Sequence, residues 1–251
     1  MNNLAIPHDN NAYTRGMAAD VALDAVLVTL ADERRRHRAV MSTSAERAAR
    51  VLREQVVEGL LRSGTKLPEE RLAQAIGVSR NTLREALSQL VAERILVREP
   101  NRGVVVATPD ADDVADVYRV RRLIEPAAVL HGAAHTPERL AAVRAAVAEG
   151  QDAGSREDWD GVATANQHFH RAVVALAGSA RLDAQMDLLL AEMRLVFRQM
   201  GGPEQFHRPY LDENAAIAGS LAAGRRSEAA KRLDRYLARA ERQLVGALSA
   251  R

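Results

Sequence analysis

Apolar residues recur at intervals of three and four positions along most of the chain, the spacing that gives an α-helix one apolar face. The pattern changes between residues 95 and 106, where Ile95-Leu96-Val97 and Val104-Val105-Val106 flank a polar stretch. Two short apolar runs separated by a turn indicate a β-hairpin. The chain is therefore predicted to be mainly α-helical, with one hairpin between two helical regions.

Two short helices are expected immediately before the hairpin. Pro68 suits a first helical turn because its missing N–H would have no partner there, and the first helix is predicted to start at this residue. Its buried side is predicted from the helical spacing of Leu72, Ala75 and Ile76. Gly77 supplies the backbone freedom that a sharp turn needs, so the helix is expected to end there.

The second short helix is predicted to begin after Ser79, which stands at an N-cap position. Its apolar stripe consists of Leu83, Leu87, Leu90 and Val91. Its polar side carries Asn81, Arg84 and Ser88, with Arg80 at the leading tip. A longer helix over residues 44–62, closed by Gly64, is expected to precede both. Three helices followed by a hairpin outline a winged helix-turn-helix.

The chemistry of this region favours DNA binding over its simpler interpretation as a packed helical hairpin. The surfaces that would face a duplex carry four arginines: Arg71, Arg80, Arg84 and Arg102. In this arrangement the N-terminal end of the second helix is expected to enter a major groove. The hairpin tip, with Arg102 and Gly103, is expected to reach the DNA backbone or a minor groove.

A second domain is predicted to begin where Pro109 breaks the last strand and acidic residues can cap a new helix. The rest of the chain shows only helical spacing. The expected helices cover residues 114–131, 136–150, 156–177, 180–200, 208–223 and 227–248. The predicted organisation is an extension over 1–43, a winged helix-turn-helix over 44–107 and an all-α helical bundle over 108–251.

The extension over 1–43 leaves two interpretations open. Residues 1–11 are polar, without periodicity, and are assigned no structure. Residues 17–30 show an apolar helical face followed by a charged run. This stretch could be an accessory helix whose basic run touches DNA, or a poorly ordered segment upstream of a working start near Met41. A signal peptide is not expected, because the basic cluster follows the apolar stretch.

Composition excludes several classes of protein. The chain has no cysteine, which rules out disulfides and thiolate metal sites, and no apolar run long enough to span a bilayer. We therefore expect a cytoplasmic protein without membrane contact. A net charge of +2 is too small for a general polyanion binder, so DNA affinity must come from local placement of charge. Motifs of hydrolases, phosphate-binding loops and zinc proteases are missing, which argues against an enzyme.

The stretches L-P-E-E-R-L-A, G-V-S-R-N-T-L-R-E-A-L-S-Q-L and R-G-V-V-V resemble the DNA-binding domain of GntR-type bacterial transcription regulators, over about residues 45–107. The resemblance to the FadR-like branch implies DNA contacts by Arg71, Ser79, Arg80, Thr82, Arg84 and Gly103. The chain departs from the family where E-G-L-V usually precedes the wing. It has Glu93-Arg94-Ile95-Leu96 there.

The C-terminal half is similar to the FCD ligand-sensing domain of FadR-type regulators, on the motifs Y-R-V-R-R-L-I-E-P, N-Q-H-F-H and E-N. Many members hold a divalent metal with one Asp and three His. At those four positions this chain has Asn166, His170, Asn214 and Tyr236. Neutral amides and a phenol are poor ligands for Zn²⁺ or Ni²⁺, so no cofactor is expected, with metal binding at His170 the disfavoured alternative. His168 is expected to point away from this face.

The same four residues are expected to form a polar effector pocket together with Arg121. Arg121 has two interpretations: it clamps the carboxylate of an organic acid, or it pairs with Glu125 one helical turn away.

The predicted function is a transcription regulator, a repressor released by a small effector, that binds an inverted repeat as a homodimer. The alternatives are a constitutive DNA-binding dimer with a degenerate pocket, and a DNA-binding module fused to an enzyme.

Overall fold

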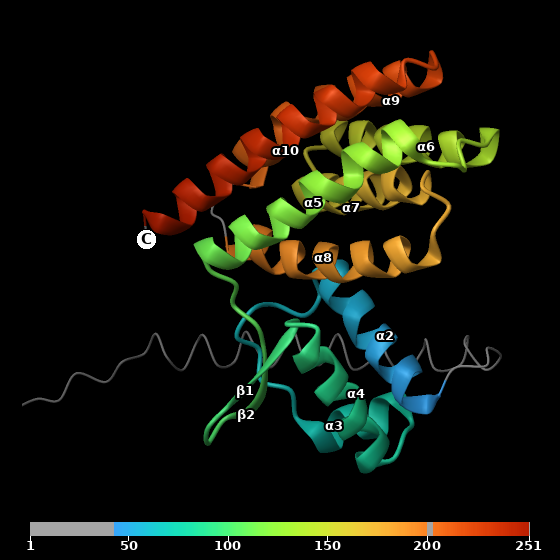
Figure 1. The fold of residues 1–251 in the computed structure, drawn as a ribbon. Helices are drawn as coiled ribbons and strands as arrows, with labels where there is room; N and C mark the ends of the chain where they lie inside the picture. Colours follow the sequence, from blue (N-terminus) through green and yellow to red (C-terminus); the bar gives the residue numbers. More distant parts are fainter. Residues whose placement is uncertain (1–42, 200–202, 251) are drawn as a thin grey trace, which may run out of the picture.

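The computed structural model describes residues 43–199 and 203–250. The predicted extension, including the apolar stretch over 17–30, lies outside these ranges. Two helical regions are stacked on each other (Figure 1). The first contains α2 (Ser44–Val57), α3 (Glu69–Ile76), α4 (Arg80–Ala92), β1 (Leu96–Glu99) and β2 (Gly103–Val106). The second contains α5 (Ala111–His131), α6 (Pro137–Ser155), α7 (Trp159–Ala175), α8 (Ala180–Gln199), α9 (Pro203–Ala222) and α10 (Arg226–Ser249). The predicted fold class, a winged helix-turn-helix joined to an all-α bundle, is confirmed.

The first helix of the winged domain is shorter than predicted. Thr43 and Glu46 form a reciprocal capping box at its start, but α2 ends at Val57 instead of Arg62. Gly59 takes a left-handed conformation with φ of 74° and turns the chain. Leu60, which was expected on the apolar face, is therefore 43% exposed.

The turn between α3 and α4 follows the predicted chemistry. Gly77 closes α3 with φ of 76°, and the Ser79 side chain accepts a hydrogen bond from the backbone N–H of Thr82 at 3.1 Å. The start of α3 was predicted one residue early, because Pro68 has an extended backbone and is the N-cap. Val91, expected within the apolar stripe of α4, is only partly buried.

The wing is an antiparallel pair in which Leu96 lies opposite Val106 and Glu99 lies opposite Gly103. Ile95, predicted as the first strand residue, is buried just before β1. Asn101 and Gly103 have φ of 62° and 84°, so the turn at the tip uses the left-handed conformations that Asn and Gly adopt most readily.

The helical bundle begins with a capping box between Asp110 and Asp113. Its predicted helices are all present, but several bounds differ. The helix α6 continues through Gly150 to Ser155, since Gly150 is not among the glycines with positive φ. Gly150 instead allows close packing, because a Cβ there would lie 3.2 Å from Leu211 Cδ2. The helix α9 starts at Pro203 rather than Arg208. Within the described residues, no helix has the length and apolarity needed to cross a membrane.

The helix α8 belongs to the cores of both regions. One side packs into the bundle through Met186, Leu189, Leu190, Met193 and Val196, as the sequence predicted, with Leu182 partly buried beside them. The opposite side contributes Ala191 and Leu195 to the core of the winged domain. In Figure 1, α8 accordingly lies between the rest of the bundle and α2. One helix therefore joins the two hydrophobic cores.

Candidate functional site

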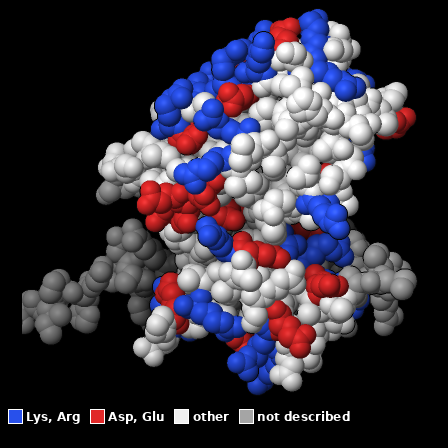
Figure 2. Space-filling view, in the orientation of Figure 1, with Lys and Arg blue, Asp and Glu red and all other residues white. Residues whose placement is uncertain are grey.

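The candidate DNA surface lies at the end of the molecule farthest from α10, where α3, α4 and the wing are found (Figure 1). Figure 2 shows Lys and Arg side chains at this end, and a second group of basic side chains over α10. The side chains of Arg71, Ser79, Arg80 and Arg84 are exposed here, and Thr82 is half-buried. The positive charge of α3 and α4 is thus on the surface that a recognition helix would present.

The exposed arginines of this surface pair with acidic neighbours. Arg80 forms an ion pair with Glu70, and Arg84 Nε lies 3.8 Å from Glu69 Oε2, so the first turn of α3 holds both side chains. Pairs this exposed contribute little to stability, typically about 0–1 kcal/mol. Because the pairs are weak, DNA phosphates can replace the carboxylates at low energetic cost.

At the wing tip, Arg102 pairs with Glu99 across the turn. Gly103 has φ of 84° and open space where a Cβ would lie. The glycine is therefore required by its backbone conformation, and its backbone is open to a partner.

The five predicted effector residues come together inside the bundle, and all are buried. Arg121 comes from α5, Asn166 and His170 from α7, Asn214 from α9 and Tyr236 from α10. Asn166 Oδ1 accepts hydrogen bonds from Asn214 Nδ2 at 2.8 Å and from the Tyr236 hydroxyl at 3.0 Å. His170 Nε2 lies 3.1 Å from the same hydroxyl. These hydrogen bonds tie three helices, α7, α9 and α10, together in one polar cluster.

Glu125 completes this cluster. Arg121 Nε donates to Glu125 Oε1 at 2.6 Å, and His170 Nδ1 lies 2.7 Å from Glu125 Oε2. Burial alone would raise the pKa of Glu125, but Arg121 and His170 together hold it below its usual value. The pKa of His170 is lowered, chiefly by burial. Of the two interpretations of Arg121, the structure therefore shows the pairing with Glu125. This pairing compensates the positive charge of Arg121, which was predicted to bind a carboxylate.

The cluster does not fit the divalent metal that related domains hold. Burial raises the pKa of Tyr236 well above its usual value, so its hydroxyl stays neutral, and the two Asn side chains add no charge. The only imidazole in the set is that of His170. Softness and charge are what Zn²⁺ and Ni²⁺ require of their ligands, and this donor set offers little of either.

A small cavity adjoins the cluster between α6, α7 and α9. It has a volume of about 10 Å³, and Asn166, His207, Tyr210, Leu211 and Asn214 form part of its wall. Burial, together with the nearby charge of Arg194, lowers the pKa of His207 to about 3, so this imidazole is neutral. His207 was not among the residues predicted to form the effector pocket. Its position depends on how α9 packs and not on local spacing.

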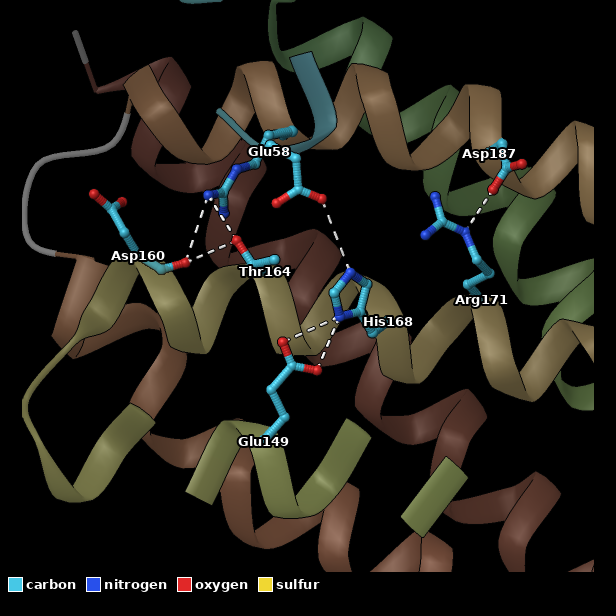
Figure 3. A network of polar contacts seen from close by, with 8 residues as sticks. Glu58, Glu149, Asp160, Thr164, His168, Arg171 and Asp187 are labelled. Carbon is cyan, nitrogen blue, oxygen red and sulfur yellow. Dashed lines mark hydrogen bonds and ion pairs between the residues drawn. The ribbon is translucent and has the colours of Figure 1, made fainter. Parts of the chain in front are cut away.

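Polar contacts lead from α7 to the winged domain (Figure 3). His168 lies on the side of α7 away from the cluster, as predicted: its Nδ1 is 2.9 Å from Glu149 of α6, and its Nε2 is 4.0 Å from Glu58 at the end of α2. Ser63 also donates a hydrogen bond to the backbone oxygen of Leu195 at 3.4 Å. The helix that carries two pocket residues therefore also touches the DNA-binding domain.

A second link between the domains uses the residue that replaces the usual glycine before the wing. Arg94 adopts φ of 60°, so the left-handed bend is preserved without glycine. Its guanidinium lies 3.9 Å from Asp116 of α5. The substitution thus places a cation at the domain boundary.

Comparison with known proteins matches both regions to families. Residues 44–106 match the model of bacterial regulatory proteins of the gntR family, and residues 116–239 match the FCD domain. The regulator BphR of Paraburkholderia xenovorans is 29% identical over 182 residues, which cover 68% of this chain and 73% of that protein. The gluconate operon transcriptional repressor of Bacillus subtilis is 42% identical over 79 residues, 32% of each chain.

The fold is also found in solved structures. A GntR transcriptional regulator from Rhodococcus sp. RHA1 aligns with a TM-score of 0.74 and 39% identity, over 82% of this chain and 99% of that one. The two matched models follow the domain division seen in the structure. The chain is therefore a member of the GntR family of transcription regulators, in the branch that carries a C-terminal FCD domain.

Proposed function

We propose that the protein is a repressor whose operator binding is released by a small molecule in the FCD domain. The observation that carries this proposal is that α7 directs side chains both to the polar cluster and to the DNA-binding domain. Asn166 and His170 face the polar cluster, while His168 faces Glu58 of the DNA-binding domain. A ligand that moves α7 would therefore shift His168, whose ring lies 4.0 Å from Glu58 at the C-cap of α2. The relative that represses the gluconate operon supports the direction of regulation.

For the operator contacts we propose Arg71, Ser79, Arg80, Thr82, Arg84, Arg102 and Gly103. The support is their common position on α3, α4 and the wing tip, together with the exposure of the arginines. Base-edge contacts by α4 would read sequence, and the wing and Arg71 would fix the orientation by phosphate contacts. Selection of bound duplexes from a random pool should return one short inverted repeat.

The decisive variants are Arg80→Ala and Arg84→Ala. Each should weaken binding to the selected duplex by about 1–3 kcal/mol, because a good arginine contact to a base is worth that much. Circular dichroism should stay unchanged, since both side chains are exposed. Arg144→Ala, an exposed arginine on α6, is the matched control and should bind normally. Normal protection of the duplex by both α4 variants would contradict the proposed recognition helix.

We also propose that the chain acts as a homodimer, because one winged domain buries too little surface for tight specific binding. The candidate contact is an apolar strip on α5, where Leu123 and Leu130 are 71% and 39% exposed. They lie seven residues apart and so share one helix face. A two-fold axis through this strip would pack it against the same strip of a second copy.

A further inference from the structure

Two buried polar atoms, on residues that line the cavity beside the polar cluster, have no hydrogen-bond partner among the described residues. These are Asn214 Oδ1 and His207 Nδ1, on side chains whose residues are 6% and 2% exposed. The Asn214 amide nitrogen is already used, because it donates to Asn166 Oδ1. Its oxygen is therefore left without a hydrogen-bond donor. Leaving a buried polar atom without a partner is costly, so this site favours a group that can donate hydrogen bonds.

The wall of the cavity carries no charge. None of its lining side chains is an Asp, Glu, Lys or Arg, and His207 is neutral. Arg121, the residue expected to hold a carboxylate, does not line the cavity, and its Nε is bound to Glu125. A carboxylate or an ammonium group would therefore lose its water without meeting an oppositely charged side chain in the cavity wall, which is unfavourable.

This inference rests on the proposed function. We propose that the effector is an uncharged molecule whose amide or hydroxyl group donates a hydrogen bond to Asn214 Oδ1 and forms a second hydrogen bond with His207 Nδ1. This differs from the organic acid that the sequence favoured. The rest of the cavity wall is largely apolar, with Val147, Val162 and Ala165 among its residues, and suits a short hydrocarbon body.

The size of the cavity sets a further condition on this ligand. Its volume of about 10 Å³ is close to the room that one water molecule needs. The Leu211 side chain closes one side, resting against the glycine face of α6: a Cβ on Gly154 would lie 2.9 Å from Leu211 Cδ1. Because Leu211 is a flexible side chain and only partly buried, its displacement is the least costly way to admit the body of a ligand.

Matched pairs of amides and acids test the proposal on the full-length protein. The probes are acetamide, propionamide and isobutyramide, and the sodium salts of the three corresponding acids, with sodium chloride balancing the ionic strength. Each pair has nearly the same shape and differs in charge. At least one amide should raise the melting temperature by about 2 °C at high occupancy, since a ligand that binds only the folded state stabilises it. The carboxylates should not.

Variants show whether the effect comes from this cavity. Asn214→Leu should abolish the rise with amides, whereas Gln151→Leu, which removes an exposed amide from α6, should keep it. His207→Phe removes the second unpartnered polar atom and keeps an aromatic ring against Phe197 and Phe206. This variant therefore tests the cavity independently if Asn214→Leu fails to fold.

Two outcomes would overturn the proposal: no amide raises the melting temperature of the parent protein, or the acids raise it as much. Operator binding is measured separately with the selected duplex. If an amide binds the cavity but leaves operator affinity unchanged, the proposed ligand class stands and the proposed release of DNA fails.

Discussion

Glu192 is a buried acid at the boundary between the two domains. It lies on α8, is 9% exposed, and faces a groove that Arg94 and Asp113 also line. Burial raises its pKa to about 7; Asp113 and Asp116 add to this shift and Arg94 opposes it. At neutral pH about half of these carboxyl groups are therefore protonated, although most glutamates are ionised there.

This raised pKa makes a testable contribution to stability. In the unfolded chain Glu192 ionises near pH 4.5, and in the folded protein near pH 7. Between these values the folded state binds more protons, so the contribution is complete below about pH 4.5 and is lost as pH rises through 7. Glu192→Gln should remove this dependence and stabilise the protein at pH 8 by about 2 kcal/mol, a value reduced for partial solvent screening.

Urea unfolding at pH 5 and pH 8 measures this effect, with the exposed Glu85→Gln as control. If Glu192→Gln and Glu85→Gln change stability equally at both pH values, Glu192 does not titrate as described.

Residues whose role is local could be predicted from sequence, and residues placed by packing could not. The N-cap at Ser79 and the turn at Gly77 depend on a few neighbouring residues, and both were predicted. By contrast, Glu125 contacts His170 from 45 residues away, and His207 reaches its cavity only through the packing of α9. The positions of Asn166, Asn214 and Tyr236 came from family resemblance, and the hydrogen bonds among them show that these positions do converge.

The polar cluster of the bundle contains a carboxylate placed behind its histidine. Glu125 holds Nδ1 of His170, so Nε2 faces the hydroxyl of Tyr236. A carboxylate behind a ligating histidine is a usual feature of metal sites. This arrangement suggests that restoring the ligands would restore the site.

We therefore expect that chelators leave the melting temperature of the parent protein unchanged. The triple variant Asn166→Asp, Asn214→His, Tyr236→His should bind about one zinc ion per chain and gain thermal stability from it. The double variant that keeps Tyr236 is the control and should bind zinc more weakly. Stoichiometric metal in the parent protein would contradict the loss of the site. A triple variant that folds without binding zinc would show that the ligand positions are wrong.

The helix α8 should make the two domains unfold together. Leu195 is fully buried in the core of the winged domain, and Leu190 is buried in the bundle. Leu195→Ala should cost about 2–5 kcal/mol, as truncations of buried leucines do. The single tryptophan, Trp159, is the first residue of α7, so its fluorescence reports on the unfolding of the bundle. Its fluorescence should therefore register the loss, with Leu190→Ala as the matched control.

If Trp159 unfolds at an unchanged urea concentration in Leu195→Ala, the domains are independent. The sequence predicted only the bundle side of α8, because its periodicity reveals an apolar face but not how many partners that helix has.

Assembly of the whole molecule is tested on the full-length chain, because isolating the bundle would expose the Ala191 and Leu195 side of α8. Leu123→Arg should convert a dimer into a monomer at micromolar concentration without changing its circular dichroism, since Leu123 is 71% exposed. Light scattering measures the mass. Leu60→Arg, on the exposed part of the winged domain, is the control and should remain dimeric. A dimeric Leu123→Arg would place the interface elsewhere.

The double packing of α8 also bears on how such regulators exchange parts during evolution. The linker around Pro109 looks like a natural point for recombination, because the two matched families meet there. A chimera joined at that point would pair this winged domain with an α8 from another protein. The core of the winged domain would then lose the side chains of Ala191 and Leu195. Functional hybrids should therefore take the residues on one side of α8 from the same parent as the DNA-binding domain. The unit that is exchanged thus includes part of α8, beyond the domain boundary near Pro109.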